Sequence, residues 1–202
     1  MKLNPDLEKY ITLLKPELDL IDTGRKELLL SVTEYVRTSS HPRLNFICTH
    51  NSRRSHLGQI WAQTAAAYFD EEVVTFSGGT EATVFHPNAI AALKRAGFEI
   101  EASDETNPRY SVRFSRQADP LVCFSKKYDD EPNPKSDFAA IMTCSEADQE
   151  CPIIPGVSER IKLLYEDPKI ADGTSEEASK YDERCRQIAT EMLYVFSKLK
   201  EA

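Results

Sequence analysis

From residue 43 onward, short apolar runs alternate with segments in which apolar residues recur every three or four positions. Short apolar runs bounded by turns predict buried strands, and the longer recurring pattern predicts amphipathic helices. The predicted strands are 44–48, 73–79, 138–144 and 161–165, and the predicted helices are 55–69, 87–96 and 174–199. Strands alternating with helices build a parallel sheet covered on both faces. We therefore predict a three-layer αβα protein of the α/β class with a four-stranded parallel sheet.

Two stretches depart from this alternation. Residues 4–39 are mostly helical in pattern, with a second helix predicted over 25–37. Residues 101–137 hold two strand-like runs, RYSVRF and PLVCFSK, which predict an inserted β-hairpin. We therefore expect an N-terminal helical extension, 1–42, and a main domain, 43–202, that carries this insertion.

Composition narrows the class of protein. With 41% hydrophobic and 29% charged residues, the chain is typical of a folded globular protein. Its net charge of −8 argues against binding nucleic acid or an anionic membrane, so neither partner is expected. The sequence has no apolar run near the roughly 20 residues that cross a bilayer, and its N-terminus has no signal-peptide pattern. We expect a cytoplasmic protein.

The five cysteines are an odd number for a disulfide framework, so reactive or buried thiols are expected. They show no CxxC spacing, and the four histidines are scattered without an HxxxH pair. Because such spacings typify zinc sites, we expect no metal and no cofactor. The cysteines are Cys48, Cys123, Cys144, Cys151 and Cys185.

Cys48 ends the first predicted strand of the sheet, and the stretch THNSRR leads from it into a helix. Ligands of open parallel sheets bind beyond the carboxyl ends of the strands. The first N–H groups of a helix lack partners of their own and, with the helix dipole, bind anions and favour a thiolate. Arg54 has a planar fork suited to a tetrahedral oxyanion, and Ser55 is placed to donate to the sulfur. The predicted oxyanion-binding residues are Thr49, His50, Asn51, Ser52, Arg53, Arg54 and Ser55.

This C-x5-R-S pattern between strand and helix resembles the phosphate-binding loop of the low-molecular-weight protein tyrosine phosphatases. Asn51 matches the family's asparagine, which adopts a left-handed conformation that this residue type tolerates. Ser77, in FSGG, matches the serine that hydrogen-bonds that asparagine. In YEDPK, Asp167 matches the family's Asp-Pro, which implies that it is the general acid. The alternative is an ordinary strand–loop–helix with a buried cysteine.

The stretch TCSEADQECP is similar to the thioredoxin-coupled arsenate reductases of the same fold. That resemblance implies that Cys48 forms a thiol–arsenate adduct, that Cys144 displaces arsenite, and that Cys151 then takes over the disulfide. A thioredoxin-like reductant would reduce the Cys144–Cys151 pair. Cys123 and Cys185 match no family position and are interpreted as packed residues.

Two further functions stay open. The first is a protein tyrosine phosphatase that hydrolyses phosphotyrosine through a Cys48 phosphocysteine, with Asp167 as general acid, and keeps the other cysteines by descent. The second is a non-catalytic module that binds oxyanions or phosphopeptides, although binding alone requires no nucleophile. A phosphatase uses only Cys48, Arg54 and Asp167, because water completes its cycle.

Several residues depart from the family pattern. His50 and Arg53 replace residues that are usually small or carry a thiol, and we interpret His50 as a surface residue or a donor at the pocket rim. Gln59 stands where some reductases have a glutamate that helps to bind potassium, so that ion is not expected. The inserted hairpin either covers the active site or forms a partner or dimer surface.

Overall fold

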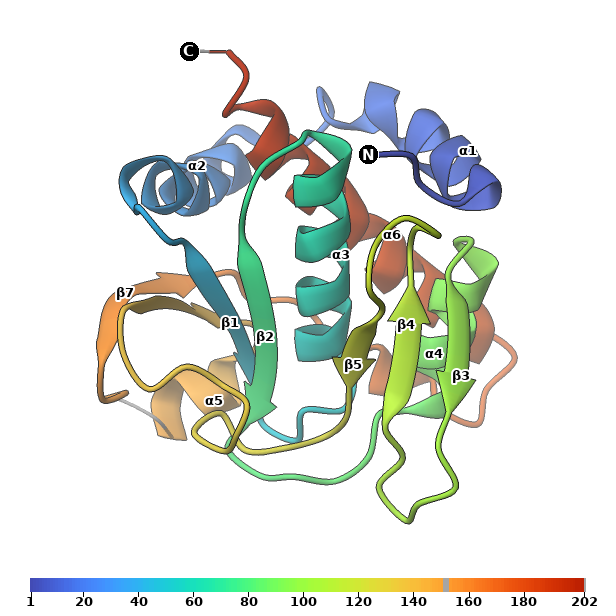
Figure 1. Cartoon of the computed structure of the whole chain (residues 1–202). Coiled ribbons are helices and arrows are strands. Elements are labelled where there is room, and N and C mark those ends of the chain that lie inside the picture. The colour runs from blue at the N-terminus through green and yellow to red at the C-terminus, as the bar shows by residue number, and fades with distance from the viewer. Residues whose placement is uncertain (151–152, 202) are drawn as a thin grey trace.

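The computed structural model describes residues 1–150 and 153–201. Its main sheet has the predicted four parallel strands, in the order β2 (Val74–Gly79), β1 (Arg43–Cys48), β6 (Phe138–Met142) and β7 (Val157–Lys162). Because all three pairings are parallel, the four strands end at the same edge, and Figure 1 shows β1 and β2 side by side with the same direction. Ile47 pairs with Gly78 on one side and with Met142 on the other, so Cys48 leaves the centre of that edge.

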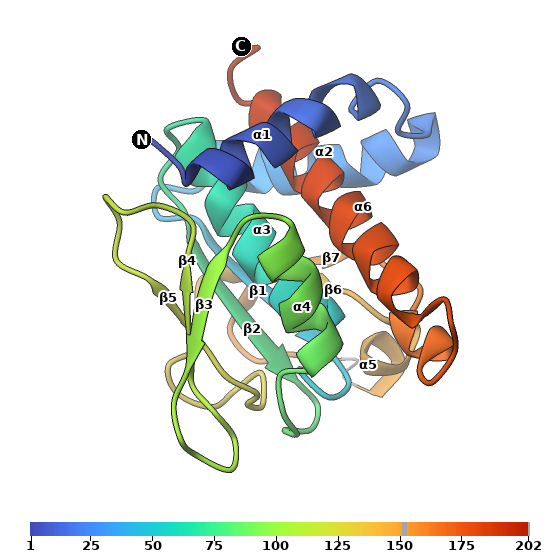
Figure 2. The same cartoon turned by 90° about the vertical axis from the view of Figure 1, so that its right-hand side faces the viewer.

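Helices cover both faces of this sheet, because alternate strand residues feed two separate apolar cores. The larger core includes Phe46 and Ile141, and the smaller includes Ile47 and Met142. Figure 2 shows the face of the sheet that holds the larger core, where α6 runs past α3 and α4. The helices are α3 (Arg54–Tyr68), α4 (Pro87–Arg95), α5 (Ser145–Glu150) and α6 (Glu177–Ser197), with the 3-10 turn η2 (Pro168–Ala171). The predicted three-layer architecture is confirmed.

The insertion and the two residues before it form a second sheet of three antiparallel strands, in the order β3 (Glu99–Ala102), β4 (Tyr110–Arg113) and β5 (Leu121–Cys123). The predicted hairpin corresponds to β4 and β5. The strand β3 was not predicted, because in its four residues only Ile100 is buried. The last strand of the main sheet was predicted at 161–165, but it begins earlier, at Val157, and ends at Lys162. Beyond it, the N–H groups of Leu163 and Tyr165 still donate to the carbonyls of Met142 and Thr143.

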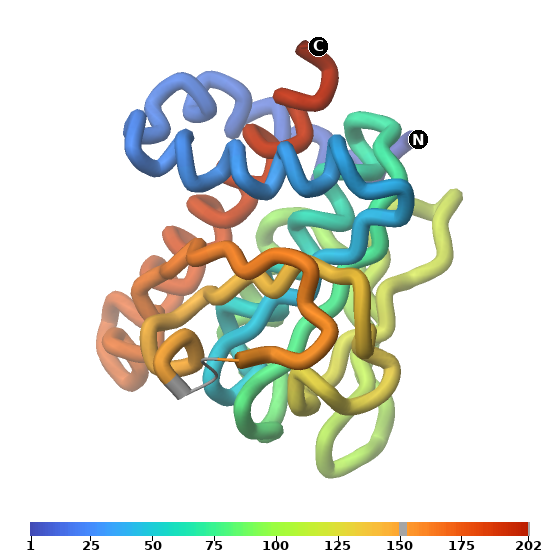
Figure 3. Tube along the Cα trace, turned by 90° about the vertical axis from the view of Figure 1, so that its left-hand side faces the viewer, coloured from blue at the N-terminus to red at the C-terminus, as the bar shows by residue number. Residues whose placement is uncertain are grey.

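The N-terminal segment contributes α1 (Pro5–Leu14), the 3-10 turn η1 (Lys15–Glu17) and α2 (Thr23–Thr38). Asp22 caps α2 by accepting the N–H groups of Gly24 and Arg25. Ile11 is fully buried and belongs to the larger core together with residues of α6. Figure 3 shows α2 passing above the β7 edge of the sheet.

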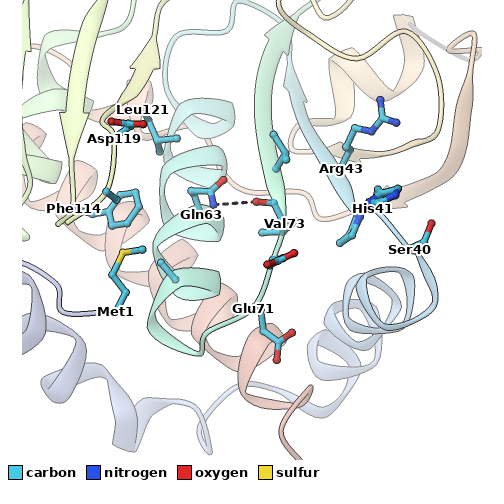
Figure 4. A pocket seen from close by; sticks show the side chains of 15 residues that line it. Met1, Ser40, His41, Arg43, Gln63, Glu71, Val73, Phe114, Asp119 and Leu121 are labelled. Atoms are coloured by element: carbon cyan, nitrogen blue, oxygen red, sulfur yellow. Dashed lines mark hydrogen bonds between the residues drawn. The ribbon is translucent and has the colours of Figure 1, made fainter. Parts of the chain in front are cut away.

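The outer edge of β2 is covered by two amide side chains of α3. Gln63 donates from Nε2 to the Val73 carbonyl at 3.1 Å and accepts the Thr75 N–H at 3.2 Å. Gln59 donates to the Thr75 carbonyl at 3.1 Å. Figure 4 shows Gln63 beside a cavity of about 510 Å³ that Val73 and Leu121 also line. This cavity contains none of the predicted site residues and lies by the amino-terminal halves of β1 and β2.

Candidate active site

The loop after β1 brings the predicted nucleophile against the start of α3. The Cys48 Sγ lies 3.1 Å from the Ser55 Oγ, and Asn51 donates from Nδ2 to that same oxygen at 2.9 Å. An amide NH₂ can only donate, so Ser55 keeps its own hydrogen for the sulfur. Asn51 has a φ of 43°, the left-handed conformation that the motif requires. The loop therefore holds Cys48 with a hydrogen-bond donor at its sulfur.

The predicted hydrogen bond between Ser77 and Asn51 is wrong. The Ser77 hydroxyl lies 3.2 Å from Nδ1 of His56, and the Asn51 Oδ1 accepts the Lys126 N–H at 3.0 Å. The Asn51 amide is thus engaged by Ser55 and by the insertion, while the fully buried His56 of α3 lies against Ser77. Lys126 was missed because it makes this contact with its backbone N–H, a group that does not depend on the residue type.

Arg54 joins the loop to the segment that follows β7. Its Nη2 donates to Oδ2 of Asp167 at 2.7 Å, and its Nη1 donates to the Tyr165 carbonyl at 3.0 Å. Its Nε is buried and has no hydrogen-bond partner within residues 1–150 and 153–201. The structure thus brings together the residues predicted as oxyanion clamp and general acid, from positions more than a hundred residues apart.

Arg53 points from the loop toward α6. Its Nε donates to the Tyr181 hydroxyl at 2.9 Å, and its Nη2 lies 3.6 Å from Oδ2 of Asp172. The same Nε lies 3.9 Å from Oδ1 of Asp167. His86 stacks on the Tyr181 ring and completes the cluster. Burial and the Arg53 guanidinium lower the pKa of His86. Arg53 therefore borders the site on the side of Asp167 and lies within an ion-pair network.

The remaining loop residues are held mainly through their backbones. The His50 carbonyl accepts hydrogen bonds from the hydroxyls of Thr83 and Ser125, while its exposed side chain lies 3.7 Å from Glu81. The Ser52 carbonyl accepts the His86 N–H at 2.9 Å. These contacts leave the His50 side chain on the surface.

Cys144 lies two residues beyond the end of β6 and is 1% exposed. Its Sγ is 3.5 Å from Oγ1 of Thr49, the residue that follows the nucleophile. Burial raises the pKa of the Cys144 thiol, and the hydrogen bond with Thr49 opposes this effect. The third cysteine of the predicted relay, Cys151, lies outside the described residues. The structure therefore brings a second thiol to the loop that carries Cys48.

Cys123 and Cys185 are buried, as predicted for packed residues. Burial raises the pKa of each thiol to about 12, so both stay protonated near neutral pH. The Cys185 sulfur accepts a hydrogen bond from Nε1 of Trp61 at 3.2 Å. Their environment is that of structural cysteines.

The end of the insertion runs beside the active-site loop. Gly79, at the end of β2, bridges to Lys127, and its N–H donates to the Lys126 carbonyl at 2.9 Å.

Within the described ranges, no group of three or more His, Cys, Asp or Glu side chains is arranged to hold a metal ion. In the same part of the chain, no helix has the length and apolar character needed to span a membrane.

Solved structures share this fold. A low molecular weight phosphotyrosine phosphatase from Vibrio cholerae O395 aligns with a TM-score of 0.56 at 12% identity, over 79% of this chain and 97% of that one. A low molecular weight protein tyrosine phosphatase from T. tengcongensis gives 0.53 at 13% identity, over 78% and 99%. The architecture is thus that of the low-molecular-weight phosphatase fold.

Sequence relatives narrow the class further. The arsenate reductase of Bacillus subtilis (strain 168) is 30% identical over 141 residues, which are 70% of this chain and 84% of that protein. The arsenate reductase of Halalkalibacterium halodurans is 30% identical over 132 residues, 65% of this chain and 78% of that protein. No family model matches. The chain belongs to the arsenate reductase family, and it is an enzyme.

Proposed function

We propose that the protein reduces arsenate to arsenite with Cys48 as nucleophile and Cys144 and Cys151 as a disulfide relay. The observation that carries this proposal is the free thiol of Cys144, whose sulfur lies 3.5 Å from the Thr49 hydroxyl in the active-site loop. A phosphatase cycle uses one cysteine and water, so it assigns no chemical role to the Cys144 thiol beside this loop.

In the first step, arsenate binds to the N–H groups of the loop and to Arg54. The Cys48 thiolate attacks arsenic, a sulfur–arsenic bond forms, and one arsenate oxygen leaves as water. The hydrogen bond of Ser55 favours the thiolate before attack. Arsenic remains in its pentavalent state in this adduct.

In the second step, the Cys144 thiolate attacks the Cys48 sulfur. The sulfur–arsenic bond breaks, its electron pair stays with arsenic, and arsenite leaves in the trivalent state. Cys151 then attacks the Cys144 sulfur, which releases Cys48 as a thiolate and leaves a Cys144–Cys151 disulfide. A thioredoxin-like dithiol reduces that disulfide by exchange. Because the cycle starts from reduced thiols, we propose a cytoplasmic location.

The second candidate is phosphotyrosine hydrolysis, and the position of Asp167 favours it. Its carboxylate meets the Arg54 guanidinium at 2.7 Å, where a general acid can protonate the leaving oxygen of a phosphate ester. Cys48 would then form a phosphocysteine that water hydrolyses, without any use of Cys144.

One experiment separates the two functions. The reduced protein is mixed with arsenate, and its disulfides are mapped by mass spectrometry, while hydrolysis of an aryl phosphate is measured in parallel. We expect a Cys144–Cys151 bond and arsenite release. Replacing Cys151→Ser should stop arsenate turnover but leave aryl phosphate hydrolysis within about twofold, whereas Cys48→Ser should abolish both. Hydrolysis without any Cys144–Cys151 disulfide would refute the reductase.

A further inference from the structure

Glu191 of α6 is a buried carboxylate with an unusually complete set of partners. Its side chain is 4% exposed, and both its oxygens accept from Arg25 of α2, at 3.0 and 2.7 Å. The Tyr165 hydroxyl donates to Oε2 at 2.7 Å, and Gln187 donates to Oε1 at 3.0 Å. A buried charge requires such compensation, so the position of each partner depends on the others.

Tyr165 connects this buried ion pair to the active site. Its hydroxyl binds Glu191, its ring lies 4.7 Å from the Arg25 guanidinium, and its carbonyl accepts Nη1 of Arg54 at 3.0 Å. Burial and the Glu191 carboxylate raise the pKa of Tyr165 well above its ordinary value, so the hydroxyl remains a donor. Asp167 follows only two residues later. One residue thus touches the ion pair with its ring and the oxyanion clamp with its backbone.

We infer that Arg25 is a positioning residue for the active site, acting through Glu191 and Tyr165 on Arg54. Arg25 lies in the N-terminal segment and not in the active-site loop. Its contacts fix the position of that segment relative to the edge of the sheet from which the loop leaves. Removing its guanidinium leaves Glu191 as a buried charge with Tyr165 and Gln187 as its remaining partners. The carboxylate then moves toward water, Tyr165 moves with it, and the carbonyl that holds Arg54 shifts. This inference rests on the proposed function only in taking an oxyanion as the ligand of Arg54.

The inference predicts an effect on anion binding and on catalysis beyond any loss of stability. A shift of about 1 Å in a positioning group can lower activity by about a hundredfold. The variant Arg25→Met should therefore weaken the binding of inorganic phosphate by about tenfold and lower kcat/KM for an aryl phosphate at least as much. Arg25→Lys, which keeps the charge, should recover part of both.

A matched control is available on α6, the helix that carries Glu191. Arg186 of α6 forms an ion pair with Glu17 of η1, so it also joins α6 to the N-terminal segment, but it makes no contact with Tyr165. Arg186→Met should leave phosphate affinity and kcat/KM within about twofold of the wild type. Tyr165→Phe serves as a mild second variant, since it removes only the hydroxyl that binds Glu191. It should weaken phosphate binding by about threefold.

The measurements are phosphate affinity by titration calorimetry and kcat and KM at 25 °C, with thermal unfolding recorded for every variant. Equal phosphate affinity in the wild type, Arg25→Met and Tyr165→Phe would overturn the inference and leave the ion pair a structural one. If Arg25→Met does not fold, unchanged affinity in Tyr165→Phe has the same meaning. A wild type that binds phosphate but reduces no arsenate would refute the proposed function alone, and the comparison of variants would still stand.

Discussion

The Arg54 guanidinium and the Asp167 carboxylate are each other's hydrogen-bond partners, with Nη2 and Oδ2 2.7 Å apart. The family resemblance assigns the arginine to the oxyanion and the aspartate to proton transfer. An oxyanion that takes the guanidinium fork must therefore compete with Asp167 for the same donor. Arg53, whose Nε lies 3.9 Å from the other carboxylate oxygen, remains beside Asp167 when Arg54 turns to the anion.

Replacing Asp167→Asn tests this competition. The amide keeps the shape of the side chain but removes its charge, so Arg54 is released more easily. We expect inorganic phosphate to bind about three to ten times more tightly, because one charge-assisted hydrogen bond no longer competes. Hydrolysis of an aryl phosphate should fall by about a hundredfold or more through loss of the general acid.

Calorimetric titration with phosphate and steady-state kinetics measure the two effects. The control is Asp182→Asn, since Asp182 pairs with Arg95 on the surface between α4 and α6 and lies outside the site. Weaker phosphate binding in Asp167→Asn, with the control unchanged, would show that the carboxylate supports the anion site and does not compete with it.

The pH dependence of arsenate reduction should follow Cys144. Burial raises the pKa of this thiol above its ordinary value, so only a small fraction is thiolate at neutral pH. Formation of the disulfide with Cys48 requires the thiolate. Arsenate turnover at saturating reductant should therefore increase from pH 7 to pH 9, whereas aryl phosphate hydrolysis, which does not use Cys144, should not show this increase.

Parallel pH profiles from pH 6 to pH 9.5 check this prediction. The variant Cys144→Ser should lose arsenate turnover, and with it the increase between pH 7 and pH 9. It should retain aryl phosphate hydrolysis. If arsenate turnover and aryl phosphate hydrolysis both rise with pH, the increase belongs to a group other than Cys144.

Gly79 should be required for the shape of the active-site loop. A Cβ atom at this position would lie 2.5 Å from the Thr49 carbonyl oxygen and 2.7 Å from the Asn51 nitrogen, and both are backbone atoms that cannot rotate away. Gly79→Ala should therefore push the loop from its position and weaken phosphate binding by about tenfold or more. Gly24→Ala, at the start of α2, is the control, since a Cβ there would meet the Asp22 side-chain oxygen at 3.3 Å and no atom of the active-site loop. Unchanged phosphate affinity in Gly79→Ala would mean that the loop adapts.

Lys126 should make the protein less stable at neutral pH than a neutral side chain would. Burial lowers the pKa of Lys126 from an ordinary value of 10.5 to about 8. The unfolded chain therefore binds more protons between those two values, and the stability of the wild type rises with pH across that interval. Below pH 8 the full penalty applies, which is about 3 kcal/mol before the attraction to the Phe124 ring, at 4.8 Å, reduces it.

The variant Lys126→Met should thus be about 1–3 kcal/mol more stable than the wild type at pH 7. The difference should shrink toward pH 10, as measured by urea unfolding at each pH. Contributions from other titrating groups cancel between the two proteins. A difference that stays constant with pH would show that the lysine charge is compensated in the folded state.

Local sequence predicted those parts of the molecule in which neighbours along the chain are also neighbours in space. The contact of Cys48 with Ser55 and the left-handed Asn51 follow from a loop of a few residues that ends in a helix. The four parallel strands followed from apolar runs. The helix α5 was missed because SEADQE has one apolar residue and so lacks a periodic pattern.

Contacts between distant segments had no such signal. Lys126 reaches Asn51 through its backbone N–H, which any residue would provide, so its identity gave no clue. Ser77 lies against His56 because the register of β2 beside α3 places them together. Arg25 and Glu191 are 166 positions apart, and their pairing depends on how two helices cross. The sequence pattern specifies each element, whereas packing decides which side chains meet.

The two glutamines on α3 also bear on how this protein behaves among copies of itself. An exposed strand edge is a template on which another chain can pair, and from there sheets can grow into aggregates. Along the outer edge of β2, the amides of Gln59 and Gln63 already occupy the N–H and carbonyl of Thr75 and the carbonyl of Val73, the residue before the strand. Two side chains thus stand in for a fifth strand at the Val73 carbonyl and at the Thr75 N–H and carbonyl, and a second molecule would have to displace them to pair with these groups.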